Sequence, residues 1–216
     1  MKIAIGVTAI VLLTGCGVVN CTEGTGEMIS KTFPQESFDS FELSSSADVE
    51  LVPSDKNAIE VYTYPNVMEK LDIDNKGGEV DLDFDGCVNM DKGMKVRVYF
   101  TKLHKVKLSG SGNIFSRSKV TTDSFEISIM GSGDANIDAE VDNLRAEIMG
   151  SGDVVLRGKT KVLKGVINGS GNIKANELAS GTANISINGS GDATLGSCAN
   201  LTSSVNGSGN VNCLGK

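Results

Sequence analysis

The sequence predicts an all-β protein: a right-handed single-stranded parallel β-helix, or solenoid, with coils of about 19–20 residues. The phrase Gly-Ser-Gly-(Asn/Asp) occurs six times, and successive first glycines are 21, 19, 19, 20 and 18 residues apart. Apolar and polar residues alternate on both sides of each phrase, which is typical of strands. The repeats contain no 3.6-residue apolar spacing, so helices are not expected there.

The chain begins with a segment typical of a bacterial lipoprotein leader. Lys2 supplies a positive charge, and the apolar run Ile3–Leu13 is too short to span a bilayer. Leu13-Thr14-Gly15-Cys16 resembles the lipobox that lipoprotein signal peptidase recognises. We therefore expect residues 1–15 to be a signal peptide and Cys16 to carry lipid, since several acyl chains on one residue give stable membrane anchoring. The alternative is an ordinary secretory leader with an incidental cysteine.

Two regions are expected after the leader. Residues 16–35 are rich in Thr, Gly and Glu and are predicted to form a lipidated flexible tether. Residues 36–216 are predicted to form the solenoid head domain, with irregular, wider coils over 36–104 and regular coils over 105–213.

The irregular region contains a degenerate copy of the repeat. Ser44–Leu51 matches the stretch that begins at Ser109, but has Ser and Ala at the glycine positions. Alternating strands are expected at Ile59–Tyr64, Val80–Phe84 and Val96–Phe100. We interpret these strands as coils of the same solenoid, separated by loops such as Asp85–Gly93.

Each Gly-Ser-Gly phrase is predicted to form a tight corner of the solenoid. Glycine suits such a corner because it adopts positive φ without strain and lets two backbones approach closely. The corner glycines are Gly110, Gly112, Gly131, Gly133, Gly150, Gly152, Gly169, Gly171, Gly189, Gly191, Gly207 and Gly209. Similar phrases in successive coils should stack directly above one another.

The residue after each phrase is predicted to form a polar ladder up the column. Asn and Asp tolerate left-handed backbone geometry and accept hydrogen bonds from nearby N–H groups. The ladder consists of Asn113, Asp134, Asp153, Asn172, Asp192 and Asn210. Calcium between Asp134 and Asp153 is an alternative, but the nonapeptide of calcium-binding β-rolls is absent. No metal or cofactor is predicted.

Other repeat architectures fit the pattern less well. A hairpin meander would place related sequences about every ten residues, whereas here they recur once per 18–21 residues. The sequence also lacks the framework of leucine-rich repeats and the strict six-residue motif of left-handed β-helices. A parallel β-helix with three short strands per coil therefore remains the prediction.

Four cysteines remain besides Cys16, and outside the cytoplasm they permit three disulfide connectivities. We favour Cys198–Cys213, because Cys213 should stack above Leu195 in the last coil, with Cys198 near the next corner. Such a bridge would pin the open end of the stack. Cys21 with Cys87 is the remaining, more weakly supported pair.

The sequence resembles the head GIN family, putative auto-transporter adhesin head domains that are common in lipoproteins of Bacteroidetes-type bacteria. The resemblance rests on Phe38–Leu43, Asp48–Leu51, Leu103–Gly112 and the serial Gly-Ser-Gly-(Asn/Asp) phrases, and covers Ser37 to Val211. It implies a parallel β-helix and an adhesin role, with no catalytic residues to transfer. Thr101-Lys102 departs from the family, whose members often have proline there.

We predict a non-enzymatic, lipid-anchored protein of the cell envelope, at the outer membrane, that acts as an adhesin or as a surface binding or structural module. Surface or periplasmic display is left open. A net charge of −7 without a basic stripe argues against nucleic acid as a partner. Expected partners are the membrane, through the lipid, and a glycan or protein on a host or neighbouring cell. Candidate contact residues are Phe115, Val155, Tyr62, Tyr64 and Tyr99.

Two alternative functions stay open. One is a glycan-active, polysaccharide lyase-like β-helix enzyme, for which the candidates are the alternating acids Asp81, Asp83 and Asp85, with Arg97 and the single histidine, His104. An acidic solvated face and a half-buried structural histidine are the simpler interpretations. The other is a self-assembling envelope scaffold, because exposed strand edges at the coil ends can pair with another chain.

Overall fold

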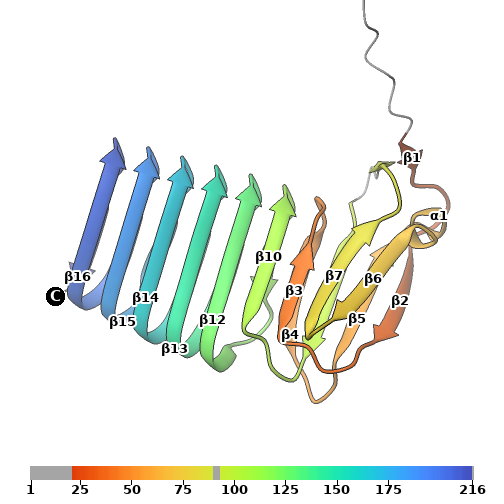
Figure 1. Ribbon diagram of the computed structural model, residues 1–216, viewed down its shortest axis with the longest axis horizontal. Coiled ribbons are helices and arrows are strands. Elements are labelled where there is room, and N and C mark those ends of the chain that lie inside the picture. The colour runs from red at the N-terminus through yellow and green to blue at the C-terminus, as the bar shows by residue number, and fades with distance from the viewer. Residues whose placement is uncertain (1–20, 90–92, 216) are drawn as a thin grey trace, which may run out of the picture.

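The computed structural model describes residues 21–89 and 93–215 and shows a column of stacked β-coils (Figure 1). The predicted signal peptide and Cys16 lie outside the described residues. The single helix of the described residues, α1 (Pro65–Met68), has four residues. None of the described segments is therefore a helix of sufficient length and apolarity to cross a membrane.

The regular coils form the parallel solenoid that the repeat predicts. Their strands are β10 (Lys105–Gly110), β11 (Ile114–Ser116), β12 (Val120–Gly131), β13 (Ala135–Gly150), β14 (Val154–Gly169), β15 (Ile173–Gly189), β16 (Ala193–Gly207) and β17 (Val211–Gly215). Equivalent residues pair in register from coil to coil. One such column is Leu108, Ile129, Ile148, Ile167, Ile187 and Val205.

Within a coil, side chains alternate between the core and the solvent. In β13 the buried positions run from Ala135 to Val141 with period two and resume at Leu144. The phase therefore shifts at Asp142–Asn143, which marks a second bend besides the Gly-Ser-Gly corner. Each regular coil is thus one nearly continuous strand, interrupted at its glycine corner, and not three separate short strands as expected.

The degenerate copy of the repeat forms the first coil of the stack. Strands β3 (Ser40–Leu43) and β4 (Asp48–Pro53) pair in parallel with β10 and β11, so that Leu43 lies beside Leu108 and Val49 beside Ile114. Ser44–Asp48 consequently occupies the corner position, as its likeness to the later phrases predicts.

The rest of the N-terminal third differs from the expected series of wider coils. Strands β7 (Glu79–Phe84) and β9 (Lys95–Phe100) continue the parallel stack beside β3 and β4. However, β2 (Ile29–Pro34), β5 (Ala58–Thr63) and β6 (Leu71–Lys76) are added antiparallel. Period-two alternation is the same for parallel and antiparallel strands, so the sequence pattern could not separate them.

Part of the predicted tether is also ordered. Strand β2 lies within residues 16–35 and pairs along its whole length with β5. Before it, β1 (Thr22–Glu23) pairs with β8 (Val88–Asn89), and a disulfide joins Cys21 to Cys87. These contacts attach residues 21–34 to the capped, N-terminal end of the column (Figure 1).

A single apolar core runs along the inside of the column. It extends from Phe38 in the first coil to Cys198 in the last, with Phe33 and Cys213 packed against its two ends. The core and both disulfides of the described residues lie between Cys21 and Cys213.

Candidate functional site

Both glycines of each corner lie too close to the coil below to carry a side chain, and only the first also has a positive φ. The first adopts a positive φ, for example 145° at Gly150, as predicted. The second does not, but a Cβ at Gly152 would lie 1.8 Å from the carbonyl oxygen of Gly133 in the coil below. Close stacking of the backbones therefore excludes a side chain at the second position, whatever its dihedral angles.

The first corner carries side chains, and no corner of the Gly-Ser-Gly kind lies beneath it among the residues that the structure describes. Ser45 and Ala47 occupy the positions at which Gly110 and Gly112 follow one coil later. Ser44–Ser46 instead border an open cavity of about 400 Å³. The glycine requirement thus begins only where one corner lies on another.

The Asn/Asp residues form a continuous hydrogen-bonded ladder. The backbone N–H of Asp153 donates to Oδ1 of Asp134 at 2.8 Å, and that of Asn172 donates to Oδ1 of Asp153 at 2.9 Å. The same bond links every successive pair of the predicted ladder, Asn113, Asp134, Asp153, Asn172, Asp192 and Asn210. The ladder begins one rung earlier, at Asp48, which accepts from Asn113.

One part of the ladder prediction is wrong. Of the described residues, none other than glycine has a positive φ, so the ladder residues do not use left-handed geometry. Their Oδ1 atoms instead accept hydrogen bonds from backbone N–H groups that would otherwise have no partner at the corner.

Among residues 21–89 and 93–215, no three acidic, histidine or cysteine side chains gather in a way that could hold a metal ion.

Asp153 is the ladder residue with the strongest charge pairing. Its second carboxylate oxygen lies 2.5 Å from Nζ of Lys174. Partial burial raises the pKa of Asp153, but hydrogen bonds from Lys174 and Asn172 outweigh burial and hold the pKa below its ordinary value.

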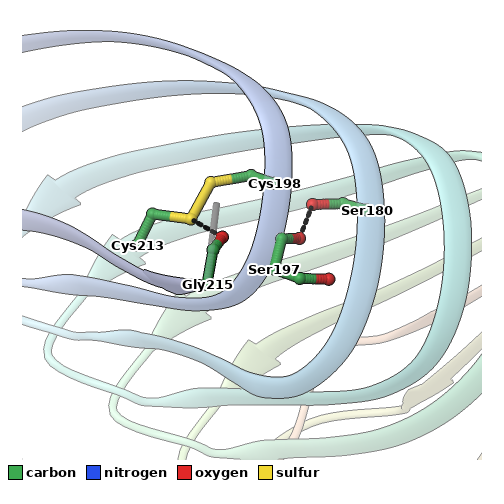
Figure 2. The surroundings of a disulfide bond; sticks show 5 residues. All are labelled: Ser180, Ser197, Cys198, Cys213 and Gly215. Carbon is green, nitrogen blue, oxygen red and sulfur yellow. Dashed lines mark hydrogen bonds between the residues drawn. A yellow bond between two sulfur atoms is a disulfide. The ribbon is translucent and has the colours of Figure 1, made fainter.

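The last coil is closed by the disulfide between Cys198 and Cys213, the pair favoured by the sequence (Figure 2). Cys213 lies beside Leu195, as its place in the repeat predicts. Next to the disulfide, the Ser180 hydroxyl donates to the carbonyl of Ser197 at 2.9 Å. The last coil is thus linked internally by the disulfide and linked to β15 by the Ser180 hydrogen bond.

The acids proposed for an enzyme do not converge with Arg97. Asp81 is exposed on β7 and lies opposite Glu42 of β3. The pKa of Asp81 is raised, mainly because its carboxyl group is partly buried and then because Glu42 and Asp83 are negatively charged. Arg97 lies on β9, which pairs with β4 and β5 and not with β7. Asp85 is exposed in the turn after β7.

His104 lies at the join between the irregular and regular coils. It is partly buried, and its Nδ1 lies 2.8 Å from the carbonyl oxygen of Ser124. A histidine bonded to the backbone in this way has a structural role at the join.

The structure does assemble one cavity with recognition chemistry, on the outer face of β2, β5 and β9. It has a volume of about 300 Å³ and is lined by Ser30, Glu60, Tyr62, Lys95 and Arg97. Lys95 and Ser30 both lie directly opposite Tyr62 in the antiparallel sheet. Three strands that are far apart in sequence thus supply a single site.

Glu60 is the hydrogen-bond acceptor that holds the neighbouring side chains of this cavity in place. Its carboxylate accepts from the Ser30 hydroxyl at 2.7 Å, from the Tyr99 hydroxyl at 2.9 Å and from Arg97 at 3.3 Å. The Ser30 hydrogen bond is the largest influence on the pKa of Glu60, which is held below its ordinary value despite partial burial. A second bond from Arg97, to Glu50 at 2.6 Å, holds the guanidinium in place.

Two groups in the cavity remain available to a ligand. Tyr62 is 42% exposed, and the side chain of Lys95 makes no hydrogen bond or ion pair within the described part of the chain. An exposed aromatic ring beside cationic donors provides stacking for an apolar face and hydrogen bonds for polar groups.

The predicted contact residues differ in exposure and in their contacts. Phe115 is exposed and Val155 half-buried on the outer face, while Tyr99 is engaged with Glu60. Tyr64 was expected to be exposed but is buried, because β5 ends at Thr63 and the chain turns into α1.

Solved structures of other bacterial proteins share this fold. The chain is similar to a solved structure of a putative adhesin from Bacteroides fragilis, with 21% identity, a TM-score of 0.80, and coverage of 89% of this chain and 99% of that one. A second, from Parabacteroides distasonis, is described as a putative lipid binding protein (20% identity, TM-score 0.68, 90% and 100% covered). At these identities the similarity shows the fold alone. Curated proteins gave no match.

The family comparison extends over most of the chain. Residues 37–216 match the family described as "Putative auto-transporter adhesin, head GIN domain". The matched range contains all six corner phrases and the entire ladder from Asp48 to Asn210. The stacked corners and the sequence match agree, and the chain belongs to the head GIN domain family.

Proposed function

We propose that this protein is a non-enzymatic, lipid-anchored adhesin of the bacterial cell envelope that binds an acidic glycan through the cavity at Tyr62. Lipid on Cys16 would hold the protein at the outer membrane. The folded column would then present its outer face to ligands. The family description supports an adhesin-like role at the cell surface, and the cavity supports the choice of ligand.

One observation carries the ligand class. Tyr62 and Lys95 combine an exposed ring with an available cation in an open cavity, beside Arg97, which pairs with Glu50 and Glu60. A sugar ring can stack on tyrosine while its carboxylate or sulfate group pairs with Lys95. The charged lining fits an acyl chain poorly, so the cavity favours an acidic sugar over a lipid.

Calorimetry with purified residues 21–216 tests this assignment. We expect an acidic probe, oligogalacturonate, to bind and neutral dextran not to bind. Tyr62→Ala and Lys95→Ala should each weaken binding about tenfold or more, which corresponds to about 1.4 kcal/mol. Lys102→Ala removes an exposed lysine elsewhere and should leave binding unchanged. Equal binding by all variants would refute the site, and release of cleaved sugar would refute the non-enzymatic assignment.

A separate experiment tests the anchor and the side of display. Cys16→Ser should release the protein from the membrane fraction into the soluble fraction. Protease treatment of intact cells should remove the wild-type protein if it is displayed outward. Retention of Cys16→Ser in the membrane would argue against lipidation, and full protection from protease would argue against adhesion.

A further inference from the structure

We propose that the C-terminal end of the column binds the same end of a second copy, strand against strand. The site of contact is the second half of β16, from Leu201 to Asn206. This part of the molecule differs from every other regular coil in three ways, which concern its backbone, its apolar side chains and its charge.

The first difference is an unpaired strand edge. β17 pairs with β16 only from Ala193 to Ser197. The stretch Leu201–Asn206 pairs with β15 on one side and has no partner on its other side within the described residues. A strand edge of this kind offers a row of free N–H and C=O groups to another strand.

The second difference is exposure of side chains that are buried elsewhere. Leu201 and Val205 occupy the inward positions that Leu163 and Ile167 fill two coils earlier. Leu163 and Ile167 are fully buried, whereas Leu201 is 38% and Val205 41% exposed. The apolar core is therefore open at this end, and a strand placed on the edge would cover it.

The third difference is the absence of charge. Residues 193–215 contain no Asp, Glu, Lys, Arg or His, although 22% of the whole chain is charged. Proteins usually protect an open edge with charged residues or proline, and this edge has neither. Because the protein carries a net charge of −7, a neutral end is the surface at which two identical molecules can approach with least repulsion.

The opposite end of the column is protected. Antiparallel strands β2, β5 and β6 and helix α1 lie there (Figure 1). Of the two edge strands, β6 carries Asp72, Asp74 and Lys76, and β2 carries Lys31 and Pro34. A head-to-tail chain of molecules would need an open edge at both ends. Contact between two C-terminal ends, related by a two-fold axis, needs only one.

Such a dimer has a consequence for adhesion. A two-fold axis perpendicular to the sheet makes the paired strands antiparallel and keeps Leu201 and Val205 of both copies on one face. The two N-terminal ends then point in opposite directions. If Cys16 anchors each copy, as proposed above, one dimer would connect two membranes. This consequence rests on the proposed function, whereas the pairing itself does not.

Sedimentation velocity of residues 21–216 over a concentration series tests the pairing. Because the contact is one strand edge, we expect a monomer–dimer equilibrium with a Kd in roughly the micromolar range. Val205→Lys places a charge in the contact and should raise the Kd about tenfold or more. Ser170→Lys adds the same charge at an exposed corner two coils away and should leave the Kd unchanged. A wild-type protein that stays monomeric, or two variants that dimerise equally, would overturn the proposal.

Vesicles distinguish the pairing from its proposed use. Residues 21–216 carrying a histidine tag at either terminus are attached to phosphatidylcholine vesicles with nickel-chelating lipid, and clustering is followed by light scattering. Attachment through the N-terminus should cluster vesicles, and attachment through the C-terminus should not. Clustering in both orientations would overturn contact through the C-terminal end. Dimerisation in solution without any clustering would leave the pairing intact and refute the connection of membranes.

Discussion

At the residue scale, the corner glycines show that one sequence phrase meets two physical requirements. Gly150 supplies a positive φ, and Gly152 supplies space for the carbonyl of Gly133. A methyl group at Gly152 would have to displace backbone of the coil below. Overpacking of a rigid interior typically costs 1–3 kcal/mol and more where the neighbour cannot move, so we expect Gly152→Ala to reduce the free energy of unfolding by about 3 kcal/mol or more.

Urea unfolding followed by circular dichroism measures this effect. Ser151→Ala, between the two glycines, is the matched control: Ser151 is exposed, and its replacement should change stability by less than about 0.5 kcal/mol. If Gly152→Ala were as mild as Ser151→Ala, the corners would not stack as closely as the structure shows.

Asp153 gives the ladder a pH dependence. Its pKa is lower in the folded protein than the ordinary value of 3.8. Its charged form therefore stabilises the fold at neutral pH, and this contribution is lost as the pH falls below 3.8 and through the folded value. Asp153→Asn keeps the Oδ1 acceptor but loses the ion pair with Lys174. The melting temperatures of wild type and Asp153→Asn should thus differ at neutral pH and converge in strong acid.

Thermal melts from pH 7 to about pH 2 test this difference. Asp192→Asn is the matched control, since Asp192 occupies the same rung position but forms no ion pair within the described residues. Its effect at neutral pH should be smaller. A constant difference between wild type and Asp153→Asn at every pH would show that the carboxylate charge has no part in stability.

At the element scale, the final coil depends on its disulfide because only one complete coil, that of β15, pairs with it. β17 pairs with β16 over only a short stretch, and residues 199–208 are all exposed. A disulfide that closes a loop of 15 residues contributes up to about 3 kcal/mol by limiting the unfolded chain. Replacing both Cys198 and Cys213 with serine should therefore release this coil locally.

Hydrogen exchange with mass spectrometry should detect that release. In the double variant, amides of residues 193–215 should exchange faster, while those of β13 and β14 keep their protection, because coils of a solenoid contact only their neighbours. The matched control is replacement of Cys21 and Cys87, which should affect the N-terminal end instead. Faster exchange throughout the column would mean that the coils unfold as one unit.

The sequence was sufficient for the regular coils because each position recurs six times. The column from Leu108 to Val205 follows from period and alternation alone. The cavity did not follow, since Tyr62 and Lys95 are neighbours only because β5 and β9 run antiparallel, and alternation carries no strand direction. Tyr64 was mispredicted for a related reason: it shares the parity of Tyr62, but the strand ends between them.

At the scale of the whole molecule, the two ends of the column are built differently. In the regular coils, neighbours in space are neighbours in sequence, so β14 contacts β13 and β15. In the N-terminal third, the order across the sheet is β2, β5, β9, β4 and β11. A strand there depends on segments distant in the chain. The C-terminal coils can thus be lost one at a time, whereas the N-terminal third must form or unfold together.

Truncation from each end tests this asymmetry. Removing residues 196–216 deletes both cysteines of one disulfide and leaves Ala193–Leu195 as the only part of β16 paired with β15. β15 then forms the last full coil, and every earlier coil is still paired. We expect this variant to keep its β-sheet circular dichroism and to lose only a few degrees in melting temperature, as a repeat array does when one terminal unit is removed.

Removing residues 21–64 instead takes away β2 to β5, which leaves β9 without both of its partners and exposes the core at Val96 and Val98. We expect that variant to be insoluble or unfolded, because uncovered apolar strands aggregate. Equal tolerance of both deletions would contradict a cooperative N-terminal cap, and unfolding after the C-terminal deletion would contradict the independence of the coils.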